Sequence, residues 1–366
     1  MLKKLLKKFY FSKDVAIDLG TSNTRILISE KGVVVNEASV LAINKKNGQI
    51  LEVGREALKM LGKTPPNIEI IQPLVDGVVS DFEVTEKMLK FFFDKLSKER
   101  FLYSPRPRVI VGIPLDVTEV EKKAVEDAVM SAGAREVYLV ENVIASAVGA
   151  RMPIQDASGN MIINFGGGVT EIAVISLSGV VAWKTLRIAG SELDQDIIHA
   201  ARNEYNLLIG KRVAEHIKTQ FSAMAEDDIG AITDPKIKKN DKNAIRVRGR
   251  DLVSGLPREV LISPYEITKF LEKSINLIVE GVKSTLEITP PELVADIYQR
   301  GMVMSGGGAQ LKGLDKAISK MVKIPVRIVD DPSTCAVRGM GIILEDKNLL
   351  SSVMVPTTRQ EEKGVV

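Results

Sequence analysis

The sequence predicts an α/β protein that is built from two similar halves. Its 366 residues are 45% hydrophobic and 27% charged, which is close to globular averages, and the chain is long enough for two domains with sizeable cores. Residues 17–29 and 163–176 have the same pattern of apolar and small polar residues. A third, glycine-rich run lies at residues 301–314. A pattern that recurs at the start of two halves indicates an internal duplication.

The first of the two similar segments predicts a β-hairpin. A strand at residues 15–18 leads into a turn at residues 20–23, and an apolar strand returns over residues 24–29. The second segment has the same outline, so the two can be aligned residue by residue. The aligned pairs are Asp18 with Asn164, Gly20 with Gly166, and Thr24 with Thr170.

Both predicted turns are built from residues suited to binding an anion. Glycine permits positive φ angles, and successive backbone N–H groups in such turns can converge on a phosphate. One glycine-rich turn alone is usually only a tight turn, but two that face each other would clamp a polyphosphate. The third run predicts a strand at residues 301–305, three glycines, and a helix beginning near residues 311–314. Its missing side chains would let the backbone approach a base or a ribose.

Other common sites are excluded by the sequence. Neither the dinucleotide motif GxGxxG in a βαβ setting nor the P-loop motif GxxxxGK[ST] is present. The only cysteine is Cys335, and the two histidines, His199 and His216, are well separated, so we expect neither a disulfide framework nor a Cys/His metal site. The sequence also contains no apolar run long enough to span a bilayer and no signal peptide, so we expect a cytoplasmic protein.

The N-terminal segment predicts an amphipathic helix over residues 1–12. Leu2, Leu5, Leu6 and Phe9 fall on one helical face, and lysines fill the other. This pattern is typical of a helix lying in an anionic membrane surface. The alternatives are a frayed basic leader and a helix docked on the protein itself. The first 13 residues contain five lysines, which is more positive charge than the whole net charge of +3. The rest of the chain is therefore slightly negative, and it lacks the basic patch expected of a nucleic-acid-binding protein.

A second membrane element is predicted in a loop near residue 100. Phe101, Leu102 and Tyr103 are adjacent and lie between basic residues. The alternative is that these three side chains plug the core. Two anchors on each subunit of an assembly would turn a marginal single-site affinity into stable binding.

Eight segments together resemble the MreB family of bacterial actin-like, rod-shape-determining proteins. The resemblance extends from Met1 to about Leu344. It implies an actin-like fold of two duplicated halves, each with two subdomains, around a nucleotide cleft. The segments are AIDLGTSNTRILI, QPLVDGVVSDFEVTEKML, PRPRVIVGIP, AGAREVYLVEN, NFGGGVTEIAVISLSGVV, IGKRVAEHIK, RGMVMSGGGAQLKGLDKAI and DDPSTCAVRGMG.

The resemblance also implies a function. It implies an ATP-binding, membrane-associated cytoskeletal protein that forms homopolymeric, double filaments and guides cell-wall synthesis in rod-shape determination. The implied cofactors are ATP and Mg²⁺. The implied partners are further copies of the chain, the anionic inner face of the cytoplasmic membrane, other MreB-type proteins and the cell-wall synthesis machinery. Two alternatives are a soluble phosphotransferase of the same superfamily and a chaperone-type ATPase, which would need a substrate domain after the nucleotide domain.

Site residues are transferred from the family position by position. The implied Mg²⁺ residue is Asp18, acting through water. For Glu215 and Lys218, the alternative is an ordinary surface pair on a helix. The implied nucleotide contacts are Gly20, Thr21, Ser22, Asn23, Gly166, Gly167, Gly168, Glu215, Lys218, Gly306, Gly307, Gly308, Ala309 and Gln310.

The resemblance further implies subdomain boundaries. Subdomain IA would comprise residues 13–35, 75–145 and 334–350, and subdomain IB residues 36–74. Subdomain IIA would comprise residues 146–185 and 250–333, and subdomain IIB residues 186–249. Residues 351–366 are predicted to be a disordered tail.

Two departures from the family pattern concern catalysis. Asn142 stands where the family has a second glutamate, and Asn164 stands where it has an aspartate. An amide cannot accept a proton usefully, so both candidates for a general base are missing. These positions therefore predict a protein that binds nucleotide and is at most a slow ATPase. The alternative is that a neighbour, Glu141, supplies the carboxylate.

Overall fold

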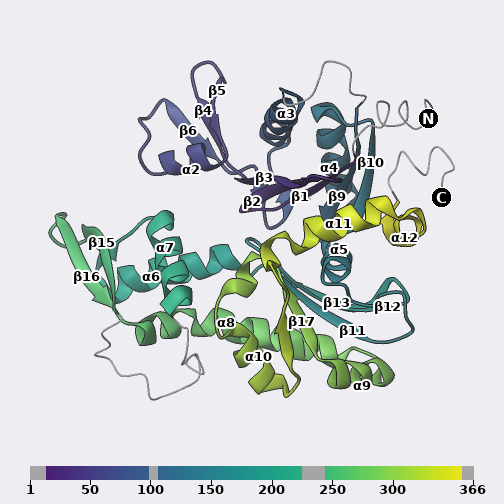
Figure 1. Ribbon diagram of the computed structural model, residues 1–366. Helices are drawn as coiled ribbons and strands as arrows, with labels where there is room; N and C mark the ends of the chain where they lie inside the picture. Colours follow the sequence, from purple (N-terminus) through teal and green to yellow (C-terminus); the bar gives the residue numbers. More distant parts are fainter. Residues whose placement is uncertain (1–13, 99–105, 225–243, 357–366) are drawn as a thin grey trace. The chain divides into compact units, whose positions relative to one another are not determined.

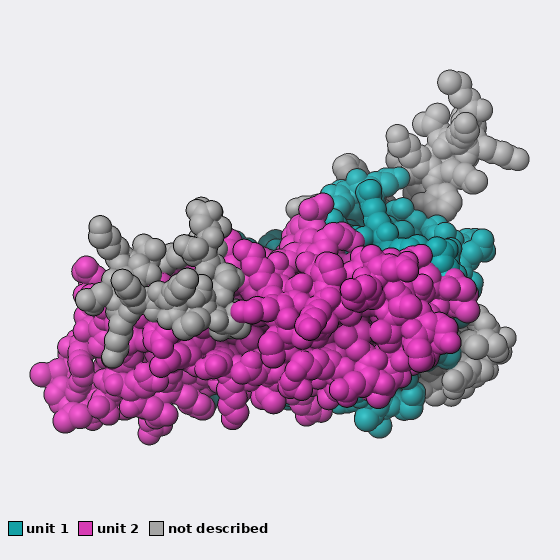
Figure 2. Space-filling view, turned by 90° about the horizontal axis from the view of Figure 1, so that it is seen from below, with its two compact units in different colours: residues 1–156, 334–366 teal, residues 157–333 magenta. Residues whose placement is uncertain are grey.

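The computed structural model describes residues 14–98, 106–224 and 244–356, and it forms two compact units (Figures 1 and 2). Unit 1 comprises Met1–Asp156 and Thr334–Val366, and unit 2 comprises Ala157–Ser333. The two predicted membrane elements, with Leu2, Leu5, Leu6, Phe9 and Phe101–Tyr103, lie outside the described residues. In the described part of the chain, no helix is both long enough and apolar enough to cross a membrane.

Unit 1 is organised around a six-stranded sheet of order β19-β10-β9-β1-β2-β3. β1 pairs antiparallel with β2 and parallel with β9, which in turn pairs parallel with β10. Buried valine, isoleucine and leucine residues of these strands form the core of the unit. The strands are β1 (Val15–Leu19), β2 (Asn23–Ile28), β3 (Gly32–Ala38), β9 (Arg108–Ile113), β10 (Glu136–Glu141) and β19 (Met354–Val355).

Helices cover both faces of this sheet. Figure 1 shows α3 (Phe82–Lys98) and α4 (Glu119–Ala132) on one face, and α5 (Asn142–Gly149) with α11 (Cys335–Glu345) on the other. α4 begins at a capping box in which Thr118 and Glu121 satisfy each other's backbone N–H groups. α5 and α11 are in backbone contact, because a Cβ atom on Gly339 would lie 1.7 Å from the Ala145 carbonyl oxygen.

Unit 1 also contains smaller elements. β5-β4-β6 is a three-stranded sheet that packs against α2 (Arg55–Met60) around Ala42 and Ala57. The strands are β4 (Leu41–Asn44), β5 (Ile50–Val53), β6 (Ile68–Ile71), and the pair β7 (Leu74–Val75) and β8 (Val78–Val79).

Unit 2 has a five-stranded sheet of order β13-β12-β11-β17-β18. β11 pairs antiparallel with β12 and parallel with β17, which pairs parallel with β18. The strands are β11 (Asn160–Phe165), β12 (Thr170–Ser176), β13 (Gly179–Leu186), β17 (Met302–Ser305) and β18 (Val326–Ile328). The accompanying α-helices are α6 (Gly190–Tyr205), α7 (Lys211–Met224), α8 (Pro264–Glu287), α9 (Pro291–Arg300) and α10 (Leu314–Val322).

The two large sheets confirm the predicted duplication. Read from β3, the first five strands of unit 1 have the order β3-β2-β1-β9-β10, which matches β13-β12-β11-β17-β18 strand for strand and direction for direction. The registers match as well. Asp18 lies opposite Arg25 in unit 1, and Asn164 lies opposite Glu171 in unit 2. The predicted alignment of Asp18 with Asn164 is therefore correct.

Several predicted boundaries differ from the structure, and those at residues 36 and 75 fall inside β3 and inside β7. α5 runs through residue 146 without a break and belongs to unit 1, so the boundary placed there is wrong. The boundary at residue 250 cuts β15 (Ile245–Asp251), which pairs with β14 (Leu207–Leu208) and β16 (Pro257–Ile262) in a separate small sheet. These errors arise because helix packing and strand pairing leave no mark on composition at those positions.

The predicted start of the tail at residue 351 is also wrong. Residues up to Val353 complete α12 (Lys347–Val353), and β19 pairs with β10 through Val355 and Leu139. This two-residue strand is too short to produce a periodic pattern, so only its pairing with the sheet edge identifies it. Residues 357–366 lie outside the described part of the chain.

Candidate nucleotide-binding site

The turn of the first hairpin is fixed by hydrogen bonds from other segments of unit 1. Ser39 Oγ donates to the Gly20 carbonyl oxygen at 2.6 Å, and Gly77 N donates to Thr21 Oγ1 at 2.8 Å. Gly20 must be glycine, because a Cβ atom there would lie 2.8 Å from the Asn23 carbonyl oxygen. The chain from Gly20 to Asn23 is therefore a pre-formed loop of the kind that binds phosphate through its backbone.

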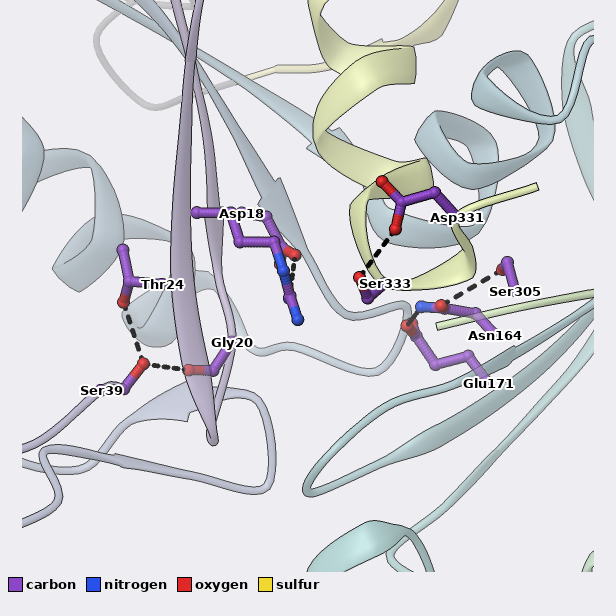
Figure 3. A network of polar contacts seen from close by, with 10 residues as sticks. Asp18, Gly20, Thr24, Ser39, Asn164, Glu171, Ser305, Asp331 and Ser333 are labelled. Atoms are coloured by element: carbon purple, nitrogen blue, oxygen red, sulfur yellow. Dashed lines mark hydrogen bonds and ion pairs between the residues drawn. The ribbon is translucent and has the colours of Figure 1, made fainter. Parts of the chain in front are cut away.

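Asp18 and Arg25 form an ion pair directly beside this turn. Arg25 Nη1 donates to Asp18 Oδ2 at 3.0 Å, and the Arg25 and Asp18 side chains are only 12% and 16% exposed. Burial raises the pKa of Asp18, and the Arg25 guanidinium opposes that rise. Figure 3 shows Asp18 near the end of its strand, with Thr24, Ser39 and Gly20 linked next to it.

The second hairpin is fixed in a different way, by the start of a helix. The first N–H groups of α6 donate hydrogen bonds to carbonyl oxygens of the hairpin turn. Gly190 N donates to Gly166 O at 3.2 Å, and Ser191 N donates to Gly167 O at 2.8 Å. These bonds occupy two of the N–H groups that a helix leaves free at its N-terminus. The positive end of the α6 dipole thus lies at the glycine turn.

A buried polar cluster lies beside the second turn. Asn164 Nδ2 donates to Glu171 Oε2 at 3.1 Å, and Ser305 Oγ donates to Asn164 Oδ1 at 3.3 Å. Glu171 and Ser305 are fully buried. Because a carboxylate only accepts hydrogen bonds, Glu171 fixes which end of the Asn164 amide faces it. Figure 3 shows Asn164 between these two partners.

The third glycine run packs against the second hairpin. Gly306 has φ +85°, and a Cβ atom there would lie 2.3 Å from the Phe165 carbonyl oxygen. A Cβ atom on Gly308 would lie 2.6 Å from the Phe165 ring. Gly307 is different, because it is exposed and a Cβ atom there would meet nothing within 4 Å. Gly306 and Gly308 therefore serve packing, and Gly307 presents its backbone outward from the fold.

Lys218 connects α7 to the start of α6, the helix whose first N–H groups hold the second hairpin. Lys218 Nζ lies 2.7 Å from Asp194 Oδ1 and donates to the Gly190 carbonyl oxygen at 2.7 Å, so it is not the simple surface pair with Glu215 that the sequence leaves open. Glu215 is exposed one turn earlier on the same helix. Burial raises the pKa of Asp194, and Lys218 opposes the rise.

Glu141 and Asn142 lie where β10 ends and α5 begins. Glu141 is partly buried, which raises its pKa, and Lys122 opposes the rise. Asn142 Oδ1 is buried and makes no hydrogen bond within the described part of the chain. It packs so closely on Gly112 that a Cβ atom there would lie 2.2 Å from it. Of the two, Glu141 alone has a group able to accept a proton.

The structure leaves the nucleotide and metal assignments as predictions. Asp18, Gly20–Asn23, Glu141 and Asn142 belong to unit 1; Asn164, Gly166–Gly168, Glu215, Lys218 and Gly306–Gln310 belong to unit 2. Within the described residues, no three His, Cys, Asp or Glu side chains are grouped as a metal site. A single carboxylate such as Asp18 suits Mg²⁺, which usually takes one or two carboxylates together with phosphates and water.

Sequence reasoning missed four polar residues of this region: Ser39, Arg25, Glu171 and Asp194. Arg25 and Glu171 could have been found, because a charged residue inside an otherwise apolar returning strand is a visible signal. Ser39 and Asp194 have no such signal, since their role depends on segments that are distant in sequence.

The duplicated sheets, each with a glycine hairpin between its first two strands, define an actin-like protein. The MamK double helical filament shares this fold, with a TM-score of 0.71 at 21% identity over 91% of this chain and 99% of that one. The family model described as MreB/Mbl protein matches residues 12–352. The chain belongs to the MreB/Mbl family.

Individual relatives agree with this assignment. The cell shape-determining protein Mbl of Bacillus subtilis is 43% identical over 93% of this chain and 98% of its own length. The cell shape-determining protein MreB of Escherichia coli K12 is 43% identical over 93% and 96%. The crystal structure of MreB 5 of Spiroplasma citri bound to AMPPNP has a TM-score of 0.83 at 34% identity, over 93% and 99%. This chain is therefore an actin-like protein of a cell shape-determining family.

The Asn164–Glu171 contact predicts that Asn164→Asp lowers the free energy of unfolding by an amount that depends on pH. Two carboxyl groups this close cannot both ionise easily, so the pKa of one should rise in the folded variant. The folded state would then hold a proton that the unfolded state releases. Stability relative to the unmodified protein should fall as pH rises from about 4 through the raised pKa, reaching a deficit of about 2 kcal/mol at pH 7.

Urea unfolding at several pH values measures this deficit. Asn164→Ala is the matched control, because it removes the hydrogen bond to the Glu171 carboxylate without adding a charge, so its deficit should grow less between pH 4 and pH 7 than that of Asn164→Asp. A deficit for Asn164→Asp that is the same at pH 4 and pH 7 would contradict the prediction.

Proposed function

We propose that this protein is an ATP-binding cytoskeletal protein that assembles into filaments on the inner face of the cytoplasmic membrane. There it would help to determine rod shape by guiding cell-wall synthesis. The observation that carries the proposal is the set of three glycine-rich segments, two of which are pre-formed loops at equivalent positions of duplicated sheets. Structures of Spiroplasma citri MreB5 bound to ADP and to AMPPNP support a nucleotide as the ligand.

The proposed site would use backbone groups and a few side chains. The turns at Gly20–Asn23 and Gly166–Gly168 would bind phosphates through N–H groups, and Gly306–Gln310 would lie against the adenosine. Lys218 and Glu215 would contact the ribose and the base. Mg²⁺, held near Asp18, would neutralise phosphate charge.

Gly307→Val is predicted to abolish nucleotide binding without unfolding the protein. The position is exposed and open, so a branched side chain meets no protein atom but would occupy the space proposed for the purine. Isothermal titration calorimetry with ATP measures the affinity. Gly210→Val is the matched control, because Gly210 is also surrounded by open space and lies outside the three glycine segments. Unchanged ATP affinity in Gly307→Val would remove the adenosine contact from the proposal.

Attachment to the membrane is proposed to depend on the N-terminal segment. Its apolar face would enter the lipid, and its lysines would contribute roughly 1 kcal/mol each on an anionic surface. The structurally similar protein MamK forms a double helical filament. In a filament of this chain, many N-terminal segments would bind the membrane at once, so that weak binding by each subunit would add up. Phe101, Leu102 and Tyr103 would provide a second, smaller contact.

Changing Leu5, Leu6 and Phe9 together to aspartate is predicted to release the protein from anionic liposomes. Co-sedimentation in a polymerising buffer is the measurement, with light scattering as the control that filaments still form. High salt should weaken binding of the unmodified protein only in part, because salt screens the lysines but not apolar burial. If the triple variant still sediments fully with the liposomes, the N-terminal helix is not the principal anchor.

Hydrolysis of ATP is proposed to be slow. The attacking water needs a group that orients and partly deprotonates it, and neither Asn142 nor Asn164 can accept the proton. The double change Asn142→Glu with Asn164→Asp is predicted to raise the rate of phosphate release by about 10² to 10⁴. Glu141→Gln is the informative companion. If the unmodified protein already hydrolyses ATP as fast as the double variant and Glu141→Gln abolishes that activity, Glu141 is the base and the slow-ATPase proposal is wrong.

A further inference from the structure

Arg25 is the one cation in the described residues that contacts Asp18, and the contact is mostly buried. The two residues are direct partners in the β1–β2 register, and their side chains are 12% and 16% exposed. Arg25 therefore stands two residues after the Gly20–Asn23 turn, and Asp18 stands two residues before it. A positive charge is thus built into the base of the first phosphate loop.

Arg25 has hydrogen-bonding capacity that Asp18 does not use. A guanidinium carries five N–H donors, and the contact with Asp18 Oδ2 is made by Nη1. Nη2 makes no hydrogen bond within the described part of the chain and is not fully buried, whereas Nε has no acceptor there but is enclosed by protein. A mostly buried guanidinium with an open, unused Nη2 donor can therefore accept a further hydrogen-bond partner that the chain itself does not supply.

The second hairpin shows that the arginine is not a requirement of the turn. At the equivalent register position of unit 2, the strand residue is Glu171, and its partner is the neutral Asn164. Both hairpins form the same glycine turn with opposite charges on the returning strand. The turn geometry therefore does not explain a cation at residue 25.

Charge at the first loop does provide an explanation. A polyphosphate placed on the Gly20–Asn23 turn would meet the carboxylate of Asp18, and the two anions would repel each other. A divalent cation ordinarily relieves such repulsion. A guanidinium can also reduce this repulsion, because it forms charge-assisted hydrogen bonds with both carboxylate and phosphate oxygens.

We propose that Arg25 is a resident counter-cation of the nucleotide site, which pairs with Asp18 and also donates to a phosphate oxygen of the bound nucleotide. It thereby reduces the dependence of nucleotide binding on Mg²⁺. This inference rests on the proposed function, since it concerns the same site. It assigns to Arg25 a contact with the ligand and to the Asp18–Arg25 pair a role in cofactor dependence.

The test compares AMPPNP affinity in Mg²⁺ with affinity in EDTA, measured by calorimetry so that no hydrolysis is needed. The unmodified protein should lose no more than about tenfold in affinity when Mg²⁺ is removed, whereas Arg25→Gln should lose at least a further tenfold. Arg25→Lys keeps the charge and should restore most of the EDTA affinity. Circular dichroism establishes that each variant is folded.

Arg108→Gln is the matched control. Arg108 pairs with Asp14 at the opposite end of β1, on the same sheet, and is similarly part-buried. Its loss removes a comparable ion pair at the end of β1 away from the glycine turn. The ratio of AMPPNP affinity in Mg²⁺ to that in EDTA should therefore be the same in Arg108→Gln as in the unmodified protein. A structural effect of losing any Arg–Asp pair of this sheet would change both variants alike.

Each outcome bears on the inference. If the ratio of AMPPNP affinity in Mg²⁺ to that in EDTA is the same in Arg25→Gln and in the unmodified protein, the inference is wrong, but the proposed nucleotide binding is unaffected. A thousandfold loss in EDTA by the unmodified protein would overturn it without any variant. Failure of the unmodified protein to bind AMPPNP in either buffer would remove the proposed function, and the inference with it.

Discussion

The antiparallel register within each hairpin is the constraint on which both glycine turns depend. It places residue 18 opposite residue 25 and residue 164 opposite residue 171. A slip by one residue would reverse which side chains face the core, where Ile17, Ile26, Ile163 and Ile172 are fully buried. The buried apolar residues therefore fix the register, and the register in turn brings each polar pair together at the end of its hairpin.

Each polar pair then determines the charge beside its turn. In unit 1 a carboxylate is neutralised by a guanidinium, whereas in unit 2 a carboxylate is held by an amide. Burial makes an unpaired charge costly in both places, so the partners are not freely interchangeable. The replacement of an aspartate by Asn164, which the sequence suggests is a loss of catalytic capacity, also spares Glu171 a second carboxylate at hydrogen-bonding distance. One substitution thus has a structural reason as well as a chemical consequence.

Close backbone packing positions the remaining parts of unit 2. Gly306 and Gly308 let the third glycine run approach Phe165, and Gly166 and Gly167 accept hydrogen bonds from the start of α6. Lys218 then ties α7 to Gly190 at that same helix start. The segments of this unit that the family resemblance assigns to phosphate, base and ribose are therefore joined to one another by direct packing and hydrogen bonds.

The sequence by itself determined the elements whose pattern is local. The hairpins, the duplication, the strand before Gly306 and the helix near residue 314 all follow from apolar alternation and glycine spacing, and the structure agrees with them. The glycine turns of the candidate site are also recognisable one segment at a time, whereas Glu215 and Lys218 are assigned from the family resemblance. Their roles toward a ligand do not follow from geometry alone and stay predictions.

Only the tertiary structure decided the contacts between distant segments. Strand β19 exists because an edge of the large sheet is available to Val355, and α5 stays in unit 1 because it packs against α11. The pairing of Asp194 with Lys218 and of Ser39 with Gly20 likewise joins separate elements. The physical reason is common to all of them: hydrogen bonding and burial between segments far apart in the chain depend on their spatial approach, which no local pattern of residues encodes.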